Sequence, residues 1–170
     1  MGRVRLILLI VGAVGALAIA AAASAARPGP AEDGTLSVRD GRGLIQLRLT
    51  GGVIGRFGSG KLTVTDSLSD TETVVVRGAD RVRDLTARTT VYWGTNIRFR
   101  IADERKITIK INAAKINLSA VGLGDVWLDG RGDPDEGVYF DGSYSLNGGA
   151  YKSIPDLREH FDLEAPPTSG

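Results

Sequence analysis

Ile97-Arg-Phe-Arg-Ile101 and Ile107-Thr-Ile-Lys-Ile111 are the two stretches of sequence that decide the fold. In both, an apolar residue alternates with a charged or polar one. Successive side chains of a β-strand point to opposite faces of the sheet, and β-branched residues such as Ile favour strands. This period of two therefore predicts strands with one face on a hydrophobic core and the other in water.

The same alternation continues in both directions along the chain, at residues 36–38, 45–49, 62–64, 116–118 and 126–128. Gly-rich joints separate these runs, for example Gly58-Ser-Gly60 and Gly122-Leu-Gly124. Short connections favour antiparallel neighbours. The spacing predicts an all-β fold, an antiparallel β-sandwich or barrel of about ten to twelve short strands. A β-solenoid is the alternative, because short strands with Gly corners also fit stacked coils.

The amino terminus has the organisation of an export signal. Arg3 and Arg5 precede an apolar run over residues 6–23, and Ala23-Ser-Ala25 offers small residues where a signal peptidase cuts. We expect residues 1–25 to be a signal peptide and the protein to be secreted or held in the extracytoplasmic cell envelope. The alternative is a retained membrane anchor, since 18 apolar residues can just span a bilayer.

Three further segments follow the signal peptide. Residues 26–34 are rich in Pro and Gly and predict a linker. Residues 35–163 form the expected β-domain, and residues 164–170 are expected to be a disordered tail. A short C-terminal helix is expected over residues 153–161, because Ser153 can cap it and Pro155 lies near its first turn.

Composition excludes several classes of protein. The chain has no Cys, so disulfide scaffolds and thiolate zinc sites are excluded. Without Arg3 and Arg5, the 21 basic residues fall to 19, against 20 acidic ones. A dedicated nucleic-acid binder would carry a strong basic excess, so we expect no nucleic-acid partner.

Residues 97–130 end in Gly-Leu-Gly-Asp-Val-Trp-Leu-Asp-Gly, and the pattern Gly-x-Leu-x-Val-x-Asp occurs at both 34–40 and 60–66. On these segments the chain resembles small exported β-rich proteins of unknown function from high-GC Gram-positive bacteria. The resemblance implies an exported β-protein. It implies no activity and no functional residues.

Two groups of residues are candidates for binding. Asp125, Asp133 and Asp135 are the metal candidates, because carboxylates on tight loops suit calcium. Solvated acidic turns without any cofactor are the alternative, and the one we expect. Candidates for ligand binding are Arg98, Arg100, Lys106 and Lys110, which form one basic face if their two strands pair around residues 102–105. Such a face would hold an anionic envelope polymer or lipid headgroups.

The sequence offers little material for catalysis. His160 is the only His, and only 6% of residues are aromatic. We therefore expect a non-catalytic exported envelope or secreted β-domain with a binding or structural role. The alternatives are a hydrolase acting on cell-wall glycans and a calcium-stabilised adhesion module. A membrane partner is expected only if the N-terminal segment is retained, and the sequence leaves the oligomeric state open.

Overall fold

The computed structural model describes residues 32–66, 73–131 and 141–165. These residues form an antiparallel all-β structure, as the alternation predicted, and none of them is helical. The seven strands are β1 (Gly34–Thr65), β2 (Thr73–Arg77), β3 (Arg81–Thr86), β4 (Thr89–Gly130), β5 (Ser143–Leu146), β6 (Lys152–Ser153) and β7 (Glu159–Leu163). None of the described residues belongs to a helix long and apolar enough to cross a membrane.

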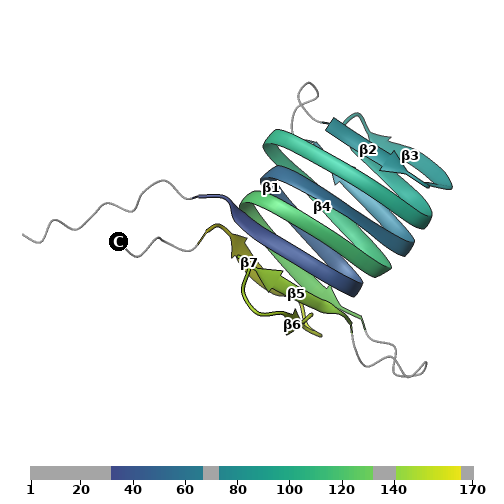
Figure 1. Ribbon diagram of the computed structural model, residues 1–170. Coiled ribbons are helices and arrows are strands. Elements are labelled where there is room, and N and C mark those ends of the chain that lie inside the picture. The colour runs from purple at the N-terminus through teal and green to yellow at the C-terminus, as the bar shows by residue number, and fades with distance from the viewer. Residues whose placement is uncertain (1–31, 67–72, 132–140, 166–170) are drawn as a thin grey trace, which may run out of the picture.

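Two very long strands, β1 and β4, make most of the fold by winding around each other (Figure 1). They run antiparallel, and the second half of β1 pairs with β4 along both of its edges. Gly43 pairs with Ala113 on one edge and with Gly130, 17 residues further along β4, on the other. Each complete turn of the coil therefore takes about that many residues of each strand.

Sharp bends divide each turn of the coil into two sides. Gly51 pairs with both Asp103 and Gly122, and Gly60 pairs with both Gly94 and Ala113, so bends from neighbouring turns stack. Gly51 and Gly122 have φ angles of 138° and 152°, which residues with a Cβ rarely adopt. We call the side made by residues 34–38, 52–57, 97–102 and 118–121 the first side. The second side consists of residues 44–49, 61–65, 89–93, 107–112 and 124–128.

The hydrophobic core lies inside the coil, between the two sides. Every second residue points inward, and Ile97, Phe99 and Ile101 on the first side are at most 3% exposed. On the second side Ile107, Ile109 and Ile111 are buried to the same degree. The alternation identified by sequence therefore separates core from surface correctly along both strands.

The prediction of ten to twelve short strands is wrong, because most Gly-rich joints do not end a strand. Gly58-Ser-Gly60 lies inside β1, and Gly122-Leu-Gly124 lies inside β4. At these joints the chain bends, yet its backbone goes on pairing with both neighbours. Glycine permits such bends for the same reason that it permits tight turns. Sequence alone therefore does not distinguish a bend from a turn.

The predicted C-terminal helix is also wrong. Residues 159–163 form β7, which pairs with residues 124–128 of β4, and Ser153 belongs to β6. A helix of nine residues is marginal by itself. A strand here satisfies the open backbone edge of β4 and buries Leu163 completely. The sequence does contain the pattern of a strand here. Phe161 and Leu163 point inward, and they alternate with His160 and Asp162, which point outward.

Several expectations concern residues that the structure does not describe. The signal peptide, most of the linker and the last five residues of the predicted tail lie outside the described ranges. So do Asp133 and Asp135, two of the three candidate calcium ligands.

Candidate functional site

The structure separates the four basic residues that the sequence grouped together. The expected pairing of residues 97–101 with 107–111 does not occur, because β4 bends near residues 103–105 and each stretch pairs with β1 instead. Arg98 and Arg100 lie on the first side of the coil, whereas Lys110 lies on the second side and Lys106 near the bend. The single basic face built on that pairing is therefore not formed.

Arg98 and Arg100 instead join two arginines from other strands. Arg98 pairs with Arg77 of β2 on one edge and with Arg56 of β1 on the other. Neighbouring strands lie about 4.8 Å apart, so these three residues form a row across three adjacent strands. Arg100 stands two residues further along β4, between Val75 and Ile54.

These four arginines line a shallow open groove on the outer surface of the first side. The groove encloses about 570 Å³. Its lining also includes Ile54 and Val75, whose exposed fractions are 59% and 41%. We call it the arginine groove; its lining residues are Val38, Ile54, Gly55, Arg56, Val75, Arg77, Arg98, Phe99, Arg100, Asn117, Leu118 and Ser119. Among the residues that the structure describes, the lining contains no carboxylate and no His.

The charge of the arginine groove is not neutralised by the protein that the structure describes. Within residues 32–66, 73–131 and 141–165, none of the four arginines forms an ion pair with a carboxylate. Like charges placed directly opposite each other on adjacent strands destabilise a sheet. Guanidinium groups bind phosphate and carboxylate oxygens through two parallel hydrogen bonds. The row therefore suits an anion that relieves this repulsion.

Asn117, at one end of the groove, is held by two hydrogen bonds to Asp40. The backbone N–H of Asp40 donates to Oδ1 of Asn117 at 3.3 Å, and Nδ2 of Asn117 donates to Oδ1 of Asp40 at 3.2 Å. A second hollow continues from here, and its lining includes Arg56, Arg98 and Lys115 together with one acidic residue, Asp40. The basic surface thus extends beyond the row of three arginines.

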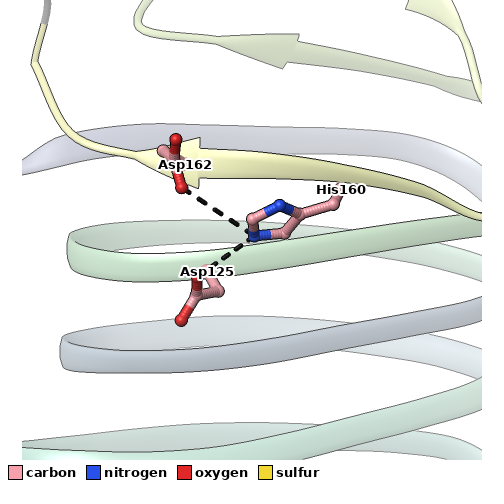
Figure 2. A network of polar contacts seen from close by, with 3 residues as sticks. All are labelled: Asp125, His160 and Asp162. Carbon is pink, nitrogen blue, oxygen red and sulfur yellow. Dashed lines mark hydrogen bonds and ion pairs between the residues drawn. The ribbon is translucent and has the colours of Figure 1, made fainter.

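Asp125, the described member of the calcium candidates, lies on the second side with two partners that the sequence did not join to it. Nε2 of His160 lies 3.0 Å from Oδ1 of Asp125 and 3.8 Å from Oδ1 of Asp162 (Figure 2). Asp125 and Asp162 are directly opposed on β4 and β7. All three can offer a ligand atom within 4.8 Å of the others.

Aromatic packing holds the ring of His160 in place. It stacks on the indole of Trp127, its direct neighbour on β4, with centroids 4.9 Å apart and an interplanar angle of 27°. Arg158 lies over the same indole at 5.6 Å, and its Nη2 donates to Oε1 of Gln46. The imidazole is therefore oriented from one face while its Nε2 points toward the carboxylates.

Sequence reasoning missed Arg56, Arg77, His160 and Asp162 as members of these two groups. His160 and Asp162 alternate with Phe161 and Leu163, and that alternation by itself places their side chains on the outer surface. Arg56 and Arg77 follow runs of adjacent apolar residues, which show no such period. His160 and Asp162 are two apart and so share one face of a strand. What the sequence did not supply is the neighbouring strand, because pairing is set by the winding of the coil.

No protein-family model matches the chain, and no curated protein or solved structure is significantly similar to it. The geometry of the groove and of the Asp–His–Asp group is therefore the basis for inferring function.

Proposed function

We propose that this protein is a non-catalytic, exported β-domain that binds anionic groups of the cell envelope in the arginine groove. The observation that carries the proposal is the cross-strand row of Arg77, Arg98 and Arg56. A row of like charges destabilises a sheet unless something compensates it. Binding an anion is the simplest use for such an arrangement on a surface.

The apolar residues of the groove indicate which anion it suits. Ile54 and Val75 flank Arg100 across the sheet, and Val121 on the same side is 47% exposed. A ligand that joins phosphate groups to hydrocarbon matches both kinds of residue. Anionic lipid headgroups meet this description better than a fully polar envelope polymer, although both share the phosphate chemistry that arginine recognises.

The test compares two charge-matched double variants of the full chain. Arg56→Gln/Arg98→Gln removes two charges from the groove, and Lys61→Gln/Lys110→Gln removes two from the exposed surface of the second side. Binding is measured by sedimentation with vesicles of phosphatidylglycerol and phosphatidylcholine, and with vesicles of phosphatidylcholine alone. Inorganic polyphosphate, added as a competitor, distinguishes a soluble phosphate polymer from a headgroup.

We expect tighter binding to the anionic vesicles than to phosphatidylcholine alone, with this preference weakened at least about tenfold in the groove variant, because each charge-assisted hydrogen bond contributes roughly 1.5–3 kcal/mol. The control variant should bind as the parent chain does. Since all variants retain the apolar N-terminal segment, that segment contributes equally to each. Equal loss in both variants would show that binding depends on overall charge and would refute a groove-specific site.

Export is the second part of the proposal and rests on residues 1–25. The charged start, the apolar run and Ala23-Ser-Ala25 support cleavage by a signal peptidase. N-terminal sequencing of protein recovered outside the cytoplasm should begin near Ala26. An intact Met1 on exported material would instead support the retained anchor.

We further propose that the coil is a two-layered form of the predicted β-sandwich. Stacked bends that separate two broad sides around one core support this classification. Neighbouring turns of the coil are antiparallel, unlike the parallel turns of β-helical solenoids. A barrel would need its outermost strands to pair with each other, and no such pairing is found among the described strands.

A further inference from the structure

We propose that Asp125, His160 and Asp162 form a zinc site that fastens β7 to β4 on the second side of the coil. The site is independent of the arginine groove, which lies on the outer surface of the first side. It joins the last strand to the coil through side chains, in addition to the backbone pairing of residues 124–128 with 159–163.

Two distances within the group lie near those of a metal site, and the carboxylate oxygens of Asp125 and Asp162 lie within 4.8 Å of each other. Zinc binds imidazole nitrogen at about 2.0–2.1 Å and carboxylate oxygen at about 2.0–2.2 Å, in tetrahedral geometry. Ligand atoms at those bond lengths lie roughly 3.3–3.5 Å from each other. The two distances from Nε2 of His160, 3.0 Å and 3.8 Å, lie on either side of that range.

The charges of the group also call for a cation. Asp125 and Asp162 face each other directly across two strands, where like charges are destabilising. Arg48 of β1 faces Asp125 from the other edge of β4, and no ion pair joins the two side chains. In the part of the chain that the structure describes, neither carboxylate forms an ion pair with Lys or Arg, and His160 is the partner they share. A divalent ion between the two carboxylates would remove this repulsion.

The donor set favours zinc over calcium. Calcium takes six to eight oxygen ligands, whereas zinc accepts imidazole nitrogen together with carboxylate oxygen. Three protein ligands leave a fourth position for water, since side-chain exposures of 45% for His160 and 73% for Asp162 keep the group open to solvent. The stacking of His160 on Trp127 holds the plane of the ring, and its Nε2 faces both carboxylates.

The single His of the chain makes a direct test possible. The full chain, carrying no histidine tag, has one imidazole, whose ring ¹⁵N signals can be followed by NMR during titration with Zn²⁺. We expect the Nε2 signal to shift on binding zinc, and the same concentration of Ca²⁺ to leave it in place. Addition of EDTA should reverse the shift, because a chelator removes the metal.

Two variants separate a built site from adventitious binding to one His. Asp162→Asn should weaken zinc binding at least about tenfold, as even outer-shell changes cost about 10–100-fold in affinity. Asp156→Asn, an exposed carboxylate six residues earlier, is the matched control and should bind zinc as the parent does. Asp162 is mostly exposed, so its variant should fold, and circular dichroism checks that it does.

Three outcomes would overturn the proposal. In the first, zinc leaves the signal of His160 unchanged. In the second, Asp162→Asn and Asp125→Asn both bind zinc as tightly as the parent, so that only the lone imidazole binds. In the third, calcium shifts His160 as strongly as zinc does, which would identify a site without preference for nitrogen ligands.

Discussion

Replacing Gly51 by Ala tests the coiled arrangement. Gly51 lies at a bend of β1, where two neighbouring turns of β4 pair with it on either edge. Its φ of 138° is a conformation that residues with a side chain rarely adopt. A Cβ at this position would also overlap the backbone carbonyl oxygen of Val121 in the adjacent pass. Gly52, the next residue, has neither problem. The nearest atom to a Cβ there is the carbonyl oxygen of Ile101 at 3.8 Å, an ordinary van der Waals contact.

The two substitutions should change the free energy of unfolding differently: Gly51→Ala should lower it, whereas Gly52→Ala should not. Backbone strain at Gly51→Ala costs about 1–3 kcal/mol. Separating the two strands to relieve the overlap weakens one or two hydrogen bonds, at about 0.5–1.5 kcal/mol each. We therefore expect a loss of roughly 2–5 kcal/mol. Gly52→Ala should be neutral or stabilise the protein by about 0.4–1 kcal/mol, because Ala restricts the unfolded chain more than Gly does.

Urea unfolding of both variants, followed by the fluorescence of Trp93 and Trp127, measures the difference. In a domain of this size the difference in unfolding free energy between the two variants corresponds to a difference in Tm on the order of 10 °C. Equal stability of the two variants within about 0.5 kcal/mol, the usual spread for surface substitutions, would refute the tight stacking of bends at Gly51.

Two further predictions concern the core. Leu47 is fully buried at the centre of the second side, so Leu47→Ala should cost about 2–5 kcal/mol in urea unfolding, whereas Arg48→Ala, on its exposed neighbour, should change stability by at most about 0.5 kcal/mol. Burial, with a smaller contribution from the charge of Glu159, raises the pKa of Tyr144 above its ordinary value of 10.0. The stability that this shift provides is therefore present below pH 10.0 and lost as the pH rises through the higher folded pKa. Tyr144→Phe should lose less stability over that alkaline range, and a decline as steep as the parent's would contradict the assignment.

The sequence correctly predicted what depends on neighbouring residues along the chain. Alternation at 97–101 and 107–111 predicted strands, the antiparallel all-β class, and which side chains face the core. The same alternation of inward and outward side chains places Arg98 and Asp125 on the surface. These properties follow from the two-residue period of a strand, which is a local property of the backbone.

Only the tertiary structure decided which strands are neighbours. Bending at Gly60 continues β1 where the sequence predicted a turn, and successive turns of β4 that flank β1 are offset by 17 residues at Gly43. Pairing with β1 and β2 brings Arg56 and Arg77 to Arg98. The bend in β4 sends Lys110 to the opposite side, and pairing with β4 places β7 beside Asp125. Register between strands distant in sequence is set by the packing of one shared core and by backbone hydrogen bonds that any residue type can make. The register between distant strands therefore cannot be predicted from a local pattern of side chains.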